Sequence, residues 1–157
     1  MTPSKDVLSR EILNSIDNSV LCWLATVSDQ GQPNVSPKEV FTAWEDKILI
    51  ANIASPQTMA NLKSNPQVCI SFVDVFVQKG FQLKGSARII HRDHEDFAAR
   101  HDALFQIAGP DFPFATLIEI QIESTKPIVA PRYRLFPETT EADQIESAMK
   151  VYGVRPI

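Results

Sequence analysis

The sequence has 157 residues and a formal net charge of −4, with 44% hydrophobic and 22% charged residues. This length and composition predict one folded domain over residues 1–157, which buries a core without disulfides or metal ions. The 15 lysine and arginine residues are scattered, which argues against the basic patch of a nucleic-acid-binding protein. Without an apolar run of about 18 residues or a secretory signal, we expect a cytoplasmic protein with no membrane-spanning segment.

The first third of the chain predicts a helix followed by a β-hairpin. Apolar residues recur every three to five positions over residues 4–16, which is typical of a helix with one apolar face. Residues 20–27 and 34–41 are predicted to be two strands, joined by a turn that ends at Gly31. Pro37 has no N–H to donate, so its strand should lie at a sheet edge or be bulged there.

The remainder of the chain is predicted to alternate strands and helices. Residues 47–53 form a third strand, and a short helix follows from Ser55-Pro56 to Asn65-Pro66. The apolar run at residues 68–77 indicates a fourth strand that is buried on both faces, whereas residues 81–89 alternate in polarity. Further elements are expected at residues 93–108 (helix), 116–123 (sixth strand), near Ile128 (extended) and 141–152 (helix).

This order of elements predicts an α+β fold that is mainly antiparallel β. Runs of hairpin-linked strands, interrupted by helices, favour an antiparallel domain over a doubly wound parallel sheet. Six or seven strands would limit their exposed edges by curling into a small barrel with flanking helices. Cys22 and Cys69 lie in apolar strands without CxxC spacing, so both are expected to be buried, reduced thiols.

Two short segments are candidate ligand sites. The predicted helix start at Ser55, Pro56, Gln57 and Thr58 would offer free backbone N–H groups to a phosphate, although Ser55 would serve equally as an ordinary cap. Asn34, Ser36 and Lys38 share one face of the second strand, where they would either bind a polar ligand or simply face solvent.

The ordered combination of motifs resembles the pyridoxamine 5'-phosphate oxidase-like split-barrel family. The resemblance covers roughly residues 10–125 and depends on motifs that are weak singly but correctly ordered. These motifs are Leu24-Ala25-Thr26-Val27, Gly31, Pro33, Ser36-Pro37-Lys38, Asn61-Leu62, Asn65-Pro66, Gly80-Phe81-Gln82-Leu83-Lys84-Gly85 and Ala87-Arg88.

The resemblance implies a split β-barrel that forms a homodimer and holds FMN at the subunit interface. It also implies that the chain is an FMN-dependent oxidoreductase acting on a small molecule that the sequence does not identify. The positions that match the family's FMN contacts are Ser36, Lys38, Asn52, Ile53, Ala54, Ser55, Thr58 and Met59, with Gln82 or Lys84 adding a polar contact from the fifth strand.

Two positions depart from the pattern of the family's oxidases. Gln57 and Thr58 stand where those oxidases carry Arg and Lys to clamp the phosphate, so Lys38 or Lys84 would have to supply the charge. The oxidase's C-terminal substrate residues also have no match, so oxidation of pyridoxamine phosphate itself is not expected. The alternatives are a non-catalytic flavin or haem binder, acting as carrier or sensor, and a deazaflavin-dependent reductase.

The three histidines do not predict a metal site. His94 and His101 are seven residues apart and would share a helix face, next to His91 and several acidic residues. A metal site requires ligands that converge, and a helix with this much charge is more often solvated.

Overall fold

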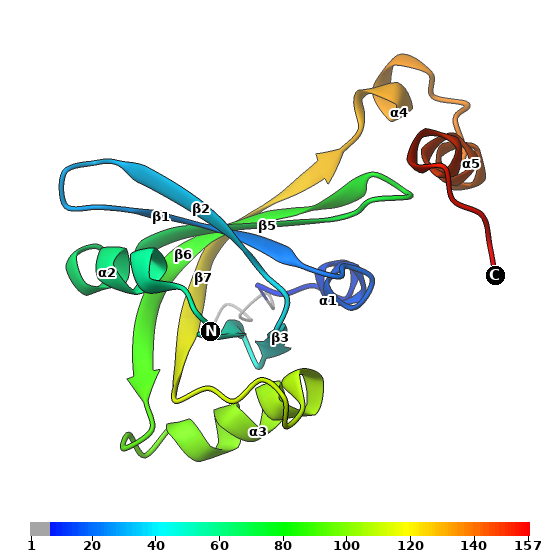
Figure 1. The fold of residues 1–157 in the computed structure, drawn as a ribbon. Coiled ribbons are helices and arrows are strands. Elements are labelled where there is room, and N and C mark those ends of the chain that lie inside the picture. The colour runs from blue at the N-terminus through cyan, green and yellow to red at the C-terminus, as the bar shows by residue number, and fades with distance from the viewer. Residues whose placement is uncertain (1–6) are drawn as a thin grey trace, which may run out of the picture.

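A computed structural model describes residues 7–157. Seven antiparallel strands form one curled sheet in the order β2-β1-β5-β6-β7-β4-β3, with helices around it (Figure 1). The strands are β1 (Cys22–Val27), β2 (Pro33–Lys38), β3 (Phe41–Trp44), β4 (Lys47–Ala51), β5 (Gln67–Asp74), β6 (Lys79–His91) and β7 (Thr116–Val129). The helices are α1 (Arg10–Asp17), α2 (Pro56–Ser64), α3 (Phe97–Ala108), α4 (Pro131–Leu135) and α5 (Glu141–Tyr152). The predicted α+β split-barrel fold is confirmed.

Two glycines allow the long strand β6 to approach its neighbours closely. A Cβ atom at Gly80 would lie 1.9 Å from the carbonyl oxygen of Phe72, and one at Gly85 would lie 2.0 Å from that of Gln121. The β6–β7 register also shifts between Lys84 and Gly85, and such a bulge increases local twist. These positions therefore need glycine, because any side chain would push apart the strands that curl the sheet.

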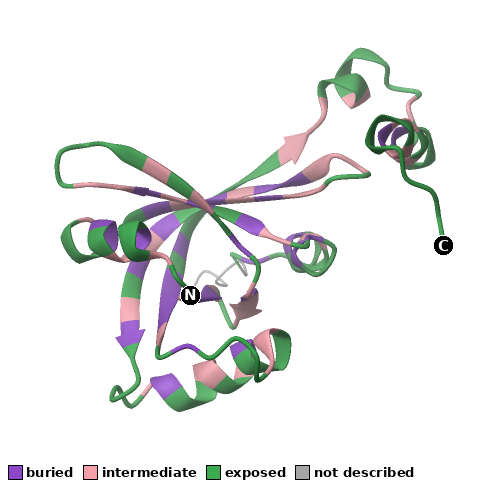
Figure 2. Cartoon of the chain, in the orientation of Figure 1, coloured by how far each residue is buried: buried purple, intermediate pink, exposed green. Residues whose placement is uncertain are grey.

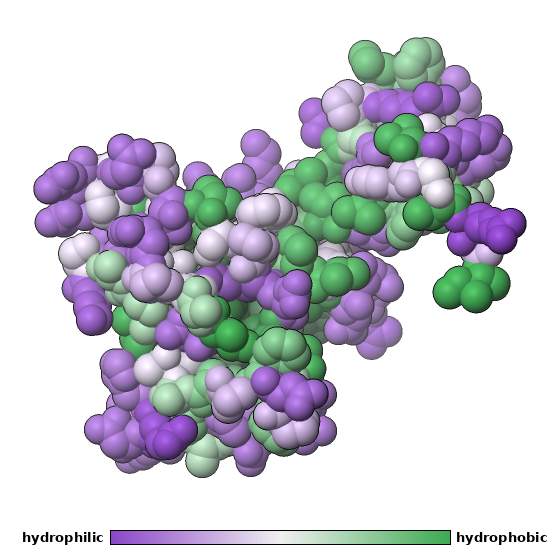
Figure 3. Space-filling model, viewed as in Figure 1, coloured by the Kyte–Doolittle hydropathy of each residue, from purple (hydrophilic) through white to green (hydrophobic). Residues whose placement is uncertain are grey.

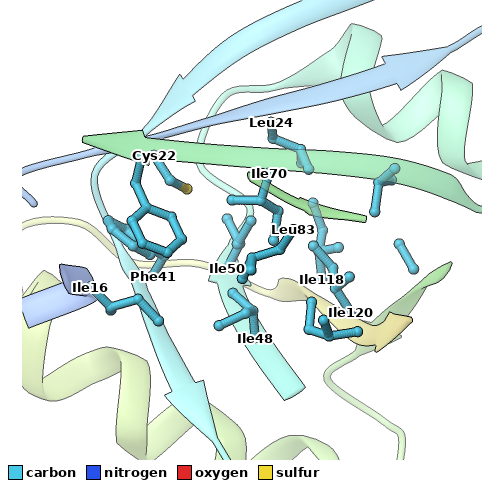
Figure 4. Packing of buried hydrophobic residues seen from close by; sticks show 14 of the residues in the cluster. Ile16, Cys22, Leu24, Phe41, Ile48, Ile50, Ile70, Leu83, Ile118 and Ile120 are labelled. Carbon is cyan, nitrogen blue, oxygen red and sulfur yellow. The ribbon is translucent and has the colours of Figure 1, made fainter. Parts of the chain in front are cut away.

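The main core fills the inside of the curled sheet. Alternate residues of β1, β4, β5, β6 and β7 point inwards and pack together, and Ile16 of α1 closes one side (Figure 4). A second cluster lies on the outer face of β4, β6 and β7, where Phe97 and Leu104 of α3 cover Leu49 and Leu117. Burial is concentrated along the strands, while the turn of the β1–β2 hairpin and the C-terminal helices are largely exposed (Figure 2).

Several predicted boundaries are wrong for identifiable physical reasons. The strand predicted at residues 34–41 is two strands, because the chain bends at Glu39-Val40 and changes its pairing partner from β1 to β4. Pro37 does lie in an edge strand, as predicted. Helix α1 begins at Arg10, where the Ser9 side chain accepts a bond from the Ile12 N–H. The earlier start predicted at residue 4 lies outside the described residues.

Burial also differs from the prediction in strand β5. Strand β5 buries only one face, with Val68, Ile70 and Phe72 inside and the alternate residues half-buried. Cys69 is one of these half-buried residues, so the prediction that both thiols are buried holds only for Cys22. The helix expected from residue 93 begins instead at Phe97.

The C-terminal segment docks on the tip of the β5–β6 hairpin. Strand β7 continues through the extended piece expected near Ile128 and leads into α4, a helix that the sequence did not predict. The Tyr133 hydroxyl donates to the Val77 carbonyl oxygen at 2.8 Å, and Lys79 pairs with Glu141 at 2.9 Å. Across residues 7–157, no helix has the length and apolar character needed to cross a membrane.

Candidate functional site

The candidate site is built where the edge strand β2 meets α2. In the β1–β2 pairing, Ser36 lies opposite Leu24 and Lys38 opposite Cys22, so both side chains point to the inner face of the sheet. The predicted shared face of Asn34, Ser36 and Lys38 is thus confirmed. Lys38 is only 5% exposed, which excludes the alternative of a solvated strand face at this position.

Four side chains form a hydrogen-bonded group that we name the Lys38 cradle: Ser36, Lys38, Ser55 and Thr58. The Lys38 ammonium donates to the Ser55 hydroxyl and, at 3.4 Å, to the Thr58 hydroxyl. The hydroxyls of Ser36 and Thr58 lie 3.2 Å apart. The structure therefore brings together residues that are 22 positions apart in the sequence and that the resemblance had placed among the FMN contacts.

The Lys38 ammonium has no counter-ion among residues 7–157. None of the ion pairs found among residues 7–157 includes Lys38. Burial lowers the pKa of Lys38, because removal from water disfavours its charged form. Burial likewise raises the pKa of the neighbouring Cys22 thiol to about 12, so this thiol stays neutral near pH 7. A buried cation with only neutral partners is a natural binding point for an anion.

The N-terminus of α2 is open rather than capped by its own serine. No side chain caps this helix, because the Ser55 hydroxyl donates to the Ile53 carbonyl oxygen at 3.2 Å and accepts from Lys38. The alternative that Ser55 simply caps its helix is therefore wrong. Gln57 does not replace the cap, because its side-chain amide donates to Asn61 at 2.9 Å. The first turn thus keeps backbone N–H groups that can bind an anion.

The segment between β4 and α2 contributes backbone shape and one free acceptor. Asn52 is held by Thr116, to which its side-chain amide donates at 2.8 Å, while its Oδ1 atom is buried without a partner. Ala54 has a φ angle of 51°, the left-handed conformation that turns the chain into α2. Met59 does not join the cradle, because its half-buried side chain packs against the main core.

A cavity of about 420 Å³ adjoins the cradle. Lys38 and Ile53 line it, and its other walls come from the β2–β3 bend and from the end of α3. The lining residues are Pro37, Lys38, Glu39, Val40, Ala51, Ile53, Ile107, Ala108 and Phe112. Ile107 and Phe112 were not predicted from the sequence as site residues. Their one signal in the sequence is their apolar character, on either side of the Gly109-Pro110 pair that ends the helix.

Gln82 and Lys84 lie away from the cradle. In the register of the sheet, Lys84 lies opposite Cys69, Cys69 lies opposite Ala25, and Ala25 lies opposite Val35. Residues that lie opposite each other point to the same face, so Lys84 shares the outer face of the sheet with Val35. Gln82 is on that same outer face, and three strand spacings, or about 14 Å, separate β6 from β2. Within one chain these two side chains therefore do not join Ser36 and Lys38, which point to the inner face.

The histidines occupy separate surroundings. His94 precedes α3 and accepts a bond from the Asp96 N–H, so it does not share a helix face with His101 as predicted. The His101 ring packs against Phe97, Phe105 and Phe114. In the part of the chain that the structure describes, no three His, Cys, Asp or Glu residues converge as metal ligands would.

The chain is similar in sequence and fold to known proteins over most of its length. Residues 8–128 match the pyridoxamine 5'-phosphate oxidase family. HupZ of Group A Streptococcus is 26% identical, with 74% of this chain and 90% of HupZ covered and a TM-score of 0.64. No match is found among curated proteins.

Two further solved structures share the fold at lower identity. An FMN-binding protein from Syntrophomonas wolfei is 18% identical, with 80% of this chain and 91% of that chain covered and a TM-score of 0.64. The haem storage protein HutZ from Vibrio cholerae is 23% identical, with coverages of 78% and 94% and a TM-score of 0.64. At these identities the likeness shows the fold alone, and the same fold carries different ligands in the two proteins.

Proposed function

We propose that this chain, which belongs to the pyridoxamine 5'-phosphate oxidase family, binds FMN and serves as a flavin-dependent oxidoreductase for a small molecule. The observation that carries the proposal is the buried ammonium of Lys38, which has no counter-ion in the described part of the chain and lies beside the N-terminus of α2, where the Ser55 side chain makes no cap bond. A phosphate would neutralise this charge and accept hydrogen bonds from the helix N–H groups.

The residues of the site fit the parts of FMN. Lys38, Thr58 and the first turn of α2 would hold the phosphate. The unpartnered Oδ1 atom of Asn52 would accept a hydrogen bond from the polar edge of the ring, and Ile53 and Ala54 would give it backbone and apolar contacts. Bound FMN would supply the redox chemistry, whereas the chain positions the ring and excludes water. Neutral Gln57, engaged with Asn61, leaves Lys38 as the cation of the cradle.

We further propose that two copies of the chain assemble around the ligand. Gln82 and Lys84 lie on the opposite face of the sheet from Lys38, so they reach the same ligand only from a second copy. A homodimer in which one copy gives the Lys38 cradle and its partner gives Gln82 or Lys84 reconciles the residue positions with the family's dimeric arrangement. The haem alternative gains no support at this cavity, where none of its described lining residues is His, Cys, Met or Tyr.

Comparing FMN with riboflavin, which lacks the phosphate, tests this proposal. Loss of a charge-assisted bond usually costs about 1.5–3 kcal/mol, so Lys38→Ala should weaken FMN binding by roughly tenfold to a hundredfold. Thr58→Ala should cost less, and riboflavin should bind weakly and respond little to either change. Lys63→Ala serves as the control, because this exposed lysine lies in the last turn of α2. Equal affinities for FMN and riboflavin would contradict a phosphate site at this helix.

A further inference from the structure

Two exposed apolar side chains, Ile107 of α3 and Phe112 of the loop that follows it, line the cavity. Ile107 is 50% exposed and Phe112 is 55% exposed, and Lys38 lines the same cavity. Helix α3, which carries Ile107 and leads into the loop of Phe112, is anchored to the sheet on its other side. Leu104 is buried in the outer core cluster, and Arg100 hydrogen-bonds the buried Glu119 of β7.

The residues that line the cavity differ in chemistry. Lys38 is the cation among them, and Phe112 and Ile107 contribute apolar side chains from α3 and the loop that follows it. Val40 and Ile53, which pack against the outer core cluster, extend the apolar lining on the strand side. Ligand sites commonly combine an apolar lining with a few fixed polar groups, and an exposed phenylalanine ring offers a flat surface for stacking.

We propose that Phe112 is the residue against which the planar ring of the bound ligand packs, with the anionic end of that ligand at Lys38. This inference rests on the proposed function and adds the orientation of the ligand and a residue that selects for its ring. The apolar lining thus favours an uncharged planar heterocycle that carries one anionic group at its far end.

Alanine substitution separates ring binding from phosphate binding. Phe112→Ala should weaken FMN and riboflavin alike, by about threefold to tenfold, because both ligands carry the ring and lose the same stacking contact. Lys38→Ala should weaken FMN alone. Phe136→Ala is the matched control, because Phe136 is 52% exposed on the C-terminal segment and does not line the cavity. Because Phe112 is partly exposed, we expect the alanine variant to fold, and a thermal melt checks this.

A fluorescence readout gives a positive signal for the same contact. Phe112→Trp places an indole against the ring, and a stacked indole quenches flavin emission, so bound flavin should be dimmer in this variant than in the parent protein. Phe136→Trp should leave the emission unchanged. If flavin binds the parent protein but Phe112→Ala has parental affinity and Phe112→Trp has parental emission, the ring lies elsewhere and this inference is overturned. If neither flavin binds the parent protein, the proposed function fails as well.

Discussion

Burial of the Lys38 ammonium carries a cost in free energy, because the charge leaves water without gaining an ion pair. Burial lowers the pKa of Lys38 in the folded chain below its value in the unfolded chain. The unfolded chain therefore binds more protons between those two pKa values, so the stability of the protein rises with pH through that window. Below the folded pKa, Lys38 is protonated in both states and the full cost of burial is present.

Replacement of Lys38 by an apolar residue of similar length should remove this cost. We expect Lys38→Met to raise the free energy of unfolding by about 1 kcal/mol at neutral pH, because no buried charge remains. The gain should shrink as pH rises and vanish above about pH 10.4, where lysine is neutral in the unfolded chain too. Urea denaturation of both proteins across this range measures the difference. A variant less stable than the parent protein at neutral pH would show that the cradle stabilises the fold.

At the scale of elements, α3 is fixed to the sheet by a buried carboxylate. Glu119 of β7 is 3% exposed and accepts hydrogen bonds from Arg88 of β6 and Arg100 of α3. We expect Glu119→Ala to lower the free energy of unfolding by about 3 kcal/mol, because it removes the buried carboxylate that both guanidinium groups share and leaves them only the more exposed Asp96. Chemical denaturation measures this effect. Asp96→Ala should change stability far less, because Asp96 pairs with the same arginines at the exposed rim.

The sequence predicted element types better than element ends or pairing changes. Strand β1 and helix α5 were predictable because local patterns and caps determine them; Thr140 and Asp143 form a capping box, and Gly153 ends α5 in the left-handed conformation. The division of the second predicted strand into β2 and β3 was not predictable, because the bend at Glu39-Val40 appears only once the two strands take different partners. Likewise, α4 is only five residues long and has too little apolar periodicity to stand out.

At the scale of the whole molecule, sequence resemblance identified one part of the candidate site, the Lys38 cradle. The members of this cradle lie in two short segments with recognisable motifs. The resemblance could not show that Gln82 and Lys84 face away from Lys38, because that depends on the register of three successive strand pairs. It also missed Phe112, because this residue reaches the cavity only through the packing of α3 on the outer face of the sheet.

The outer face of β1 and β5 carries the surface that we expect to join two copies. Trp23, Val75 and Phe76 are partly exposed around a hollow of about 410 Å³. Hydrophobic side chains gather between the barrel and the C-terminal helices on the face shown in Figure 3. Phe76 is 38% exposed, whereas the nearby Phe72 and Phe81 are buried in the main core. An exposed apolar area of this kind is typical of a protein interface.

We expect a two-fold dimer that buries more than about 2,000 Å² in total, the lower bound of the obligate class. Light scattering should therefore give about twice the chain mass of 17.5 kDa, and Trp23→Lys should shift the protein towards the monomer by placing a charge in the apolar interface. Leu135→Lys is the control, because Leu135 is exposed on α4 and does not line the hollow. A stable monomer of the parent chain at micromolar concentration would contradict the dimer. If the partner also completes the ligand site through Gln82 or Lys84, Trp23→Lys should weaken FMN binding while the Lys38 cradle in each chain stays intact.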